Sequence, residues 1–252
     1  MIANLFGRRH QELLRAEVPA GTRLYAIGDI HGCLGPLRNL LGQVREDAAA
    51  HRAQRKVVVY LGDYVDRGTD SRGVIDLLLS NPLPGFEAVH LKGNHEDSLL
   101  RFLEDEQIGP QWFSYGGDAT LYSYGVRPPR IITDKQELQR AQREFARKLP
   151  IEHRAFFNRL ALMHVEGDYA FVHAGVRPRV PLDHQISEDV LWIRDEFLQS
   201  SLDFGKIVVH GHSISETPTL RPNRIGIDTG AFASGRLTCL VLEKAQREFL
   251  AT

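Results

Sequence analysis

Residues 57–70 read VVVYLGDYVDRGTD, a stretch that begins as a buried strand and ends in a dense group of charges. Valines, a tyrosine and a leucine fill positions 57–61, and a short apolar run of this kind, bounded by glycine, is typical of a strand. The eight positions after Gly62 hold three aspartates and an arginine. Open α/β sheets bind ligands beyond the carboxyl ends of their strands. The stretch therefore predicts a strand with a functional loop at its end.

Two further apolar runs in the first hundred residues end in the same way. RLYAI leads into Gly28-Asp29 and FEAVHLK leads into Gly93-Asn94, just as VVVYL leads into Gly62-Asp63. Amphipathic stretches follow, such as LGPLRNLLGQV and HEDSLLRFLEDE. Alternating short strands and helices predict an α/β layer architecture. Three strand ends of this kind can share one crevice.

The rhythm changes at about residue 109. WFSYGGDATLYSYGVRPPR precedes DKQELQRAQREFARK, which is typical of a helix, and prolines at 128, 129 and 150 interrupt the segment. We expect a mainly helical cap insertion at about 109–160, within a single domain that spans residues 1–252.

The last third of the chain carries the signals of β-structure. ALMHVEGDYAFVHAG predicts a hairpin that turns at Gly167-Asp168. KIVVHG, RIGIDTG and RLTCLVLE predict three later strands.

Composition excludes several classes of protein. The 31 lysines and arginines nearly balance the 32 aspartates and glutamates, so the net charge of -1 gives no general attraction for nucleic acid or an anionic membrane. No apolar run approaches the ~20 residues of a membrane span, and residues 1–18 lack the apolar core of a secretory signal. Cys33 and Cys239 lie far apart, which favours a reducing compartment. We expect a soluble cytoplasmic protein, and no feature of the sequence predicts its oligomeric state.

Five strand ends carry side chains that metal ions prefer, each within two residues of a glycine, in GDIHG, GDYVDRG, GNHE, HAG and GHS. A single aspartate or histidine of this kind is more often a cap or a structural residue than a ligand, but the repetition favours one shared site. Carboxylates and imidazoles together suit manganese, iron or zinc. Six donors are too many for one four-coordinate ion and suit two ions that share a bridging carboxylate. The six are Asp29, His31, Asp63, Asn94, His173 and His212.

Taken in order, these blocks resemble the signature of the phosphoprotein phosphatase branch of the metallophosphoesterases. IDTGA at 227–231 and LWIRDE at 191–196 are most similar to its bacterial and bacteriophage members. The blocks run from residue 28 to residue 231, so the resemblance covers most of the chain. It implies an α/β fold in which a β-sandwich of two mixed sheets is flanked by helices, with loops that hold two divalent metal ions. Manganese is the expected metal, with iron and zinc as alternatives.

The resemblance also assigns the ligands. The first ion is given Asp29, His31 and Asp63; the second is given Asp63, Asn94, His173 and His212. Asp63 is then the bridge between the two ions.

Five residues receive other roles by the same resemblance. His95 is the general acid, and Asp66 pairs with it and favours its protonated form. Arg67 and Arg194 grip the phosphate oxygens, for which a guanidinium fork is well shaped, and Asn94 contacts the phosphate as well. Taken without the resemblance, Arg194 is more simply a surface partner of Asp195 or Glu196.

Two aspartates near these blocks receive lesser roles. Asp70 is expected to cap the helix that starts at SRGVIDLLLS. Asp228 is expected either to support the site from behind its ligands or to be unrelated to it.

The expected activity is that of a metal-dependent phosphomonoesterase, most simply a serine/threonine protein phosphatase in which a metal-activated water attacks the phosphorus directly. Its substrate is then a phosphoprotein or a small phosphoester. A symmetric bis(5'-nucleosyl)-tetraphosphatase is the close alternative, although that branch tends to have alanine in place of Asp66. A non-catalytic metal-bound binding module is the alternative of another class. No basic and aromatic tract indicates a nucleic-acid phosphodiesterase.

Overall fold

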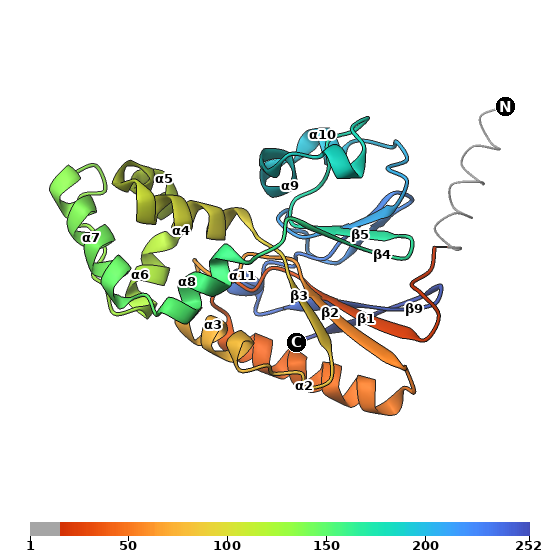
Figure 1. Cartoon of the computed structure of the whole chain (residues 1–252). Coiled ribbons are helices and arrows are strands. Elements are labelled where there is room, and N and C mark those ends of the chain that lie inside the picture. Colours follow the sequence, from red (N-terminus) through yellow and green to blue (C-terminus); the bar gives the residue numbers. More distant parts are fainter. Residues whose placement is uncertain (1–15) are drawn as a thin grey trace.

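The computed structural model describes residues 16–252, so the expectation about a secretory signal in residues 1–18 lies almost wholly outside the described residues. Two five-stranded mixed sheets form the centre of the molecule (Figure 1). Their strand orders are β10-β9-β1-β2-β3 and β4-β5-β6-β8-β7. The predicted fold class, a sandwich of two mixed sheets flanked by helices, is confirmed.

The first sheet contains the three strands that end in the predicted polar loops. Its members are β1 (Thr22–Ile27), β2 (Arg55–Tyr60), β3 (Glu87–His90), β9 (Thr238–Glu243) and β10 (Gln246–Ala251). β1, β2 and β3 are parallel, so their polar ends meet at one edge of the sheet. The sequence does not predict β10, because QREFLA lacks an apolar alternation; pairing with β9 along all of its residues holds it in place.

The second sheet contains the predicted hairpin. Its members are β4 (Met163–Glu166), β5 (Tyr169–Val172), β6 (Ile207–His210), β7 (Thr219–Arg221) and β8 (Arg224–Gly226). β4 and β5 are antiparallel and turn at Gly167-Asp168, as predicted. Gly167 has a φ of 59° and its backbone lies so close to Glu17 that a side chain would collide with the Glu17 carbonyl. β5, β6 and β8 are parallel, so a second set of carboxyl ends lies together.

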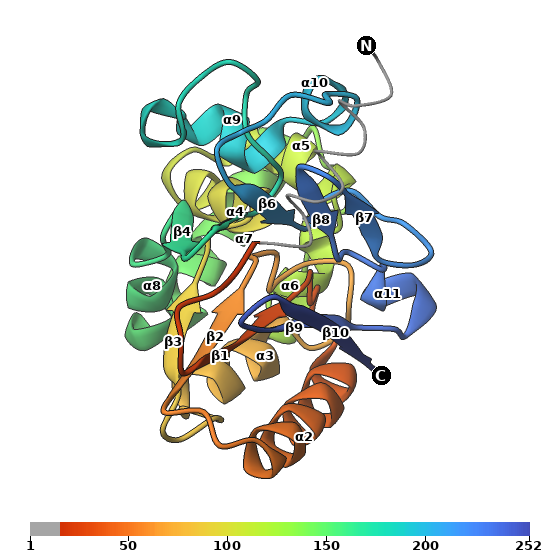
Figure 2. The same cartoon turned by 90° about the vertical axis from the view of Figure 1, so that its right-hand side faces the viewer.

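Helices cover the outer faces and one end of the sandwich (Figures 1 and 2). Against the first sheet lie α2 (Leu34–Ala50) and α3 (Ser71–Leu79), and against the second lie α9 (Ser187–Trp192) and α10 (Asp195–Leu198). Asp70 caps α3 as predicted, since its Oδ1 accepts the Gly73 N–H at 2.9 Å. The short helix α11 (Ala231–Ser234) follows β8.

A group of helices gathers beyond one end of the sheets, on the left in Figure 1. It consists of α4 (Asn94–Glu104), the 3₁₀ turn η1 (Glu106–Ile108), α5 (Gly109–Ser114), α6 (Gly117–Ser123), α7 (Lys135–Lys148) and α8 (Ile151–Asn158). The predicted segment 109–160 is therefore mainly helical. No helix in the described part of the chain is both long enough and apolar enough to span a bilayer.

Strand alternation divides the apolar residues between two cores. Leu24 faces the second sheet and packs with Phe171 and Ile225 in the centre of the sandwich. Tyr25 and Val58 point to the opposite face and pack beneath the helices. Burial on both faces explains why the parallel strands read as continuous apolar runs.

A buried arginine connects β1 with α2. Arg23 is 2% exposed, and its guanidinium group donates to both carboxylate oxygens of Asp47, at 2.8 and 2.9 Å. It also pairs with Glu243 at 2.6 Å, and the Tyr25 hydroxyl donates to Asp47 at 2.6 Å. Burial acts to raise the pKa of Asp47, but the hydrogen bonds from Arg23 and Tyr25 outweigh burial and lower it.

Asp47→Ala is expected to reduce the free energy of unfolding by about 2 kcal/mol, because it leaves a buried guanidinium group partly unpaired while Glu243 retains its contact. Urea denaturation at pH 7 would measure the loss. Since the native pKa is lowered, the wild-type advantage should be complete above the unfolded pKa and should shrink as the pH falls through the native pKa. The matched control is Glu87→Ala, which breaks the exposed Arg55–Glu87 pair and should cost under about 1 kcal/mol. Equal losses in the two variants would contradict the role of burial.

Candidate metal centre

The predicted donor residues come together from five loops. All six side chains are buried, and they reach the same place from the ends of β1, β2, β5 and β6 and from the start of α4. The backbone there is strained. Eight described residues other than glycine have a positive φ, and five of them belong to these loops: His31, Asp63, Asp66, Arg67 and His212. Such backbone conformations cluster at functional sites, where the surrounding structure enforces them.

Asn94, His173 and His212 form one compact group of donor atoms. The Oδ1 atom of Asn94 lies 2.8 Å from Nε2 of His173 and 2.9 Å from Nδ1 of His212, and the two imidazole nitrogens are 3.2 Å apart. Ligand atoms about 2.1 Å from a shared cation lie about 3–3.5 Å from one another. The group therefore has close to the spacing that one cation requires.

The Oδ2 atom of Asp63 lies between three imidazoles. It is 3.5 Å from Nε2 of His31, 3.4 Å from Nε2 of His173 and 3.8 Å from Nε2 of His95. Two groups that could hold a metal ion share this aspartate: one contains His31 and His95, and the other contains His173 and His212. A carboxylate in this position is able to contact two ions at once.

Backbone carbonyls fix the tautomers of two of these histidines. Nδ1 of His31 donates to the Val65 carbonyl and Nδ1 of His173 donates to the Leu61 carbonyl, each at 2.9 Å. In a neutral ring this leaves Nε2 without a proton. Nε2 of His173 then faces the Asn94 Oδ1, which is also an acceptor, at 2.8 Å. A cation between the two acceptors would relieve that repulsion.

Asp29 lies beside these groups without belonging to either. Its Oδ2 accepts the backbone N–H of His212 at 2.9 Å, while its Oδ1 is buried and has no hydrogen-bond partner. Nε2 of His31 and Nε2 of His212 are likewise buried without a hydrogen-bond partner. Buried polar atoms are rarely left unpaired. Three such atoms in one place fit a bound cation.

Burial shifts the pKa values of the candidate ligands. It raises the pKa of Asp29 and of Asp63, lowers that of His31, and lowers that of His173 to about 3. For Asp29 the charges of Asp228 and Asp63 add to the effect. A divalent cation compensates the buried carboxylates for their lost hydration and binds imidazole in its neutral form. The residues present therefore fit a metal centre.

His95 and Asp66 form a buried pair next to the donor groups. Nδ1 of His95 lies 2.7 Å from Oδ2 of Asp66, and Nε2 lies 3.3 Å from Nη2 of Arg67. The predicted neighbours are thus in contact. The pKa of His95 is nevertheless lowered, to about 3, by burial and by the charges of Arg67 and Arg194. Pairing with an ionised Asp66 alone would raise the pKa of His95, so the shift is opposite to the predicted one. Burial also raises the pKa of Asp66, to about 7, which makes this carboxyl group less readily ionised.

Arg67 and Arg194 differ in how they are held. Arg67 is half-buried, and its guanidinium group lies 4.7 Å from the centre of the Phe232 ring. Arg194 is exposed, and among the described residues its guanidinium group has no ion pair; Glu196 pairs instead with Arg177 at 2.7 Å. The alternative, a surface pair of Arg194 with Asp195 or Glu196, is therefore not found among the described residues.

Sequence reasoning missed Glu96, a buried residue that organises the loop after β2. Its Oε2 accepts the backbone N–H groups of Asp63 and Gly93, both at 2.9 Å, and its Oε1 accepts those of Tyr64 at 2.8 Å and Val65 at 3.3 Å. One carboxylate thus satisfies four backbone donors around Asp63. Its place in GNHE is the only signal that could have identified it.

Aromatic residues border the candidate centre, and sequence reasoning missed these as well. The Phe232 ring is 5.4 Å from that of His31, and the Tyr115 ring lies 6.0 Å from that of His95 and 5.7 Å from that of Trp192. They come from α11, the α5–α6 turn and α9, which no local pattern connects with the strand-end loops.

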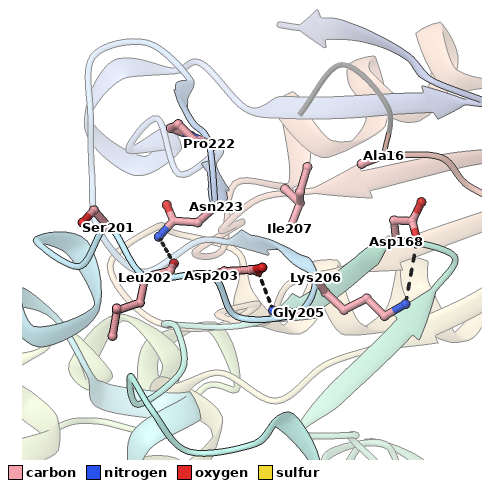
Figure 3. A pocket seen from close by; sticks show the side chains of 10 residues that line it. All are labelled: Ala16, Asp168, Ser201, Leu202, Asp203, Gly205, Lys206, Ile207, Pro222 and Asn223. Carbon is pink, nitrogen blue, oxygen red and sulfur yellow. Dashed lines mark hydrogen bonds and ion pairs between the residues drawn. The ribbon is translucent and has the colours of Figure 1, made fainter. Parts of the chain in front are cut away.

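A separate cavity of about 240 Å³ lies elsewhere on the second sheet (Figure 3). None of the candidate ligands lines it, and four of its polar side chains already have partners: Asp168, Asp203, Lys206 and Asn223. Lys206 donates to the Gly167 carbonyl, and the Asn223 amide donates to the carbonyls of Ser200 and Leu202. The strand-end centre is therefore the stronger candidate for chemistry.

Comparisons with known proteins identify the family. The calcineurin-like phosphoesterase family model matches residues 22–235. The chain is 30% identical over 227 residues to serine/threonine-protein phosphatase 2 of Salmonella typhimurium, covering 85% of this chain and 90% of that protein. It is 26% identical over 244 residues to the asymmetrical bis(5'-nucleosyl)-tetraphosphatase PrpE of Bacillus thuringiensis, covering 85% and 88% respectively.

A solved structure of a cold-active protein tyrosine phosphatase is also similar, with a TM-score of 0.58 at 16% identity over 95% of this chain and 82% of that one. At this identity the likeness shows a shared fold alone. The family match covers most of the chain, and the relative at 30% identity is a phosphatase. The chain thus belongs to the calcineurin-like metallophosphoesterases, in their phosphoprotein phosphatase branch, and is a phosphoester hydrolase.

Proposed function

We propose that the protein is a serine/threonine protein phosphatase with two divalent cations, manganese in the first instance, at the strand-end centre. Asp29, His31 and Asp63 would hold one ion. Asp63 would also hold the other, together with Asn94, His173 and His212. The bound cations would supply Lewis-acid activation of a water molecule and neutralise the charge of the phosphate.

The observation that carries the proposal is the contact between His95 and Asp66 at 2.7 Å, with Nε2 of the ring turned toward Asp63 and Arg67. When the bond from phosphorus to the leaving oxygen breaks, that oxygen can take a proton from Nε2 of His95. Serine and threonine alkoxides are strongly basic leaving groups and depend on such a proton. The nucleotides released from a dinucleoside polyphosphate leave through weakly basic phosphate oxygens and depend on it far less.

Arg67 and Arg194 would bind the non-bridging oxygens of the phosphate, assisted by Asn94. Both guanidinium charges contribute to the lowered pKa of His95. A phosphate dianion that pairs with them would remove that contribution, and it would draw Nη2 of Arg67 away from the imidazole. Binding of substrate would thereby help His95 to hold the proton that it later donates.

Dinucleoside tetraphosphate hydrolysis is the second candidate, and the similarity to the asymmetrical tetraphosphatase PrpE favours it. The sequence-based expectation of a symmetric enzyme differs in the position of cleavage, which the products would identify. Asp66 favours the phosphatase, because a pair built to protonate a leaving group is of little use when that group is a phosphate.

A substrate comparison decides between the two. With manganese present, we expect the wild-type protein to have a kcat/KM for a phosphoserine peptide that is at least about 10-fold above that for diadenosine tetraphosphate. p-Nitrophenyl phosphate serves as the reference substrate, since it needs no general acid. A preference for the dinucleotide would overturn the first proposal and support the second. A protein inert toward all three would indicate a binding module.

We further propose that the chain is a single domain in which residues 109–160 are a cap insertion, and that the protein is cytoplasmic. The strand-end loops on both sides of the helical segment contribute to one candidate centre, which supports the first proposal. Both cysteines are free thiols, which supports the second.

A further inference from the structure

Asp66 is held by more than its contact with His95. The carboxylate is wholly buried, and two side chains of the helical segment donate to it: Nε1 of Trp112 to Oδ2 at 2.8 Å, and Oγ1 of Thr120 to Oδ1 at 2.5 Å. The Thr120 hydroxyl also accepts the backbone N–H of Asp66 at 2.9 Å. The orientation of the Asp66 carboxylate therefore depends on Trp112 of α5 and Thr120 of α6, which lie 46 and 54 residues further along the chain.

The same helices hold the neighbouring Arg67. Its backbone N–H donates to the Gly116 carbonyl at 3.1 Å, and its Nε donates to the Tyr115 carbonyl at 3.4 Å. Asp66 and Arg67 have φ values of 72° and 65°. Residues other than glycine rarely adopt this backbone conformation, and it requires support from outside the loop. The α5–α6 segment gives that support at both residues: its helices contact Asp66 and its turn contacts Arg67.

Packing alone does not explain why position 112 is a tryptophan. The Trp112 ring lies among other aromatic rings, 4.9 Å from that of Phe102 and 6.0 Å from that of Phe145, where a phenylalanine ring would also pack. Its one polar atom is used by Asp66. Gly117 leaves room for the larger ring, because a side chain there would come within 2.4 Å of it. The fold therefore accommodates an indole where a phenylalanine ring would also pack, and the N–H is the polar group that the indole adds.

We infer that Trp112 and Thr120 are positioning residues for the His95–Asp66 pair, so that the α5–α6 segment controls how well the centre protonates a leaving group. The inference rests on the proposed function, which gives His95 the role of acid. With all three side-chain donors in place, the carboxylate is fixed in rotation and aims one oxygen at Nδ1 of His95. Removing the Thr120 hydroxyl leaves the buried Oδ1 without a donor, and removing the Trp112 N–H leaves His95 as the only side chain in contact with Oδ2. Either loss lets the carboxylate, and with it the imidazole, turn away.

Trp112→Phe and Thr120→Val test this in the full chain with manganese. Thr120→Val keeps the size of the buried side chain and removes its hydrogen bond, whereas Trp112→Phe removes the hydrogen bond together with part of the ring. For each we expect kcat to fall by about 10-fold on a phosphoserine peptide and by less than about 2-fold on p-nitrophenyl phosphate, with KM and metal content unchanged. Thr120→Ser, which keeps the hydroxyl, should restore the peptide activity. Equal losses on both substrates, or no loss on either, would overturn the inference.

Two further variants separate positioning from general damage to the helices. Tyr124→Phe removes another buried hydrogen bond of the same segment, from the Tyr124 hydroxyl to His153, without touching Asp66, and should leave the ratio of the two activities as in the wild type. In an Asp66→Asn background, Trp112→Phe should cause no additional loss, because the group on which it acts is already altered. Multiplied losses in the double variant would contradict a role through Asp66.

The proposed function and the positioning role can fail independently of each other. If the wild-type protein has no metal-dependent phosphatase activity, the proposed function fails. If His95→Asn removes peptide activity selectively while Trp112→Phe and Thr120→Val do not, only the positioning role fails.

Discussion

Asp63→Asn is expected to lower the occupancy of both proposed metal ions together and to reduce kcat by at least about 10³-fold. The reason is the central position of one oxygen: Oδ2 lies within 3.5 Å of imidazole nitrogens from both donor groups. An amide in its place removes a negative charge from a site whose other candidate ligands are one more carboxylate, Asp29, and neutral groups. Neither ion would then keep the charge compensation that it requires.

The substitution should leave the loop itself intact. Asp63 has a φ of 50°, a conformation that asparagine tolerates nearly as well as aspartate. The Oδ1 atom accepts the backbone N–H of His95 at 3.2 Å, and an amide oxygen can do the same. Elemental analysis of the dialysed protein and a manganese titration would measure the occupancy. Asp70→Asn is the matched control, because Asp70 belongs to the same loop and caps α3 outside the centre. A variant that keeps one ion at wild-type affinity would show that Asp63 is not the bridge.

His95→Asn is expected to keep both ions and to lose between about 10²-fold and 10⁴-fold of kcat on a phosphoserine peptide. On p-nitrophenyl phosphate the loss should be much smaller, because that leaving group departs without a proton. Nε2 of His95 lies 3.8 Å from Oδ2 of Asp63, which is the longest of the three distances between that oxygen and an imidazole nitrogen. The proposal therefore makes His95 a neighbour of the metal ions rather than a ligand.

Metal content and the two kcat values, measured on the same preparation, test the assignment. Equal losses on the two substrates would argue against a general acid, and a loss of one ion would make His95 a ligand. His153→Asn provides the matched control: this histidine is also buried and hydrogen-bonded at both ring nitrogens, to Tyr124 and Asp76, but it lies in α8 away from the centre.

The sequence predicted the parts of this molecule that local patterns determine. The apolar runs before Asp29, Asp63 and Asn94 become parallel strands of one sheet, and the polar loops that follow them meet, as their Gly-Asp and Gly-Asn endings indicated. The hairpin at Gly167-Asp168 is equally local. The repetition of strand-end clusters also predicted that His173 and His212 join the same centre, where the structure contains them; their roles as ligands stay predictions.

What the sequence could not predict depends on contacts between distant segments. The four amides that bind Glu96 face it only after the loop has folded. Trp112 and Thr120 reach Asp66 from a segment whose local pattern indicated helix and nothing more. The pKa of His95 moves downward because burial and two arginines from separate loops act together, and no single motif contains that sum. β10 exists because β9 offers it a partner.

The origin of the donor residues has a consequence for folding. Asp29 and Asp63 follow strands of the first sheet, while His173 and His212 follow strands of the second. An ion held by both sets is a cross-link between the two halves of the sandwich, and it is lost whenever the sheets separate. Its binding free energy then contributes to the free energy of unfolding. The stability of the sandwich should therefore rise with the concentration of available metal.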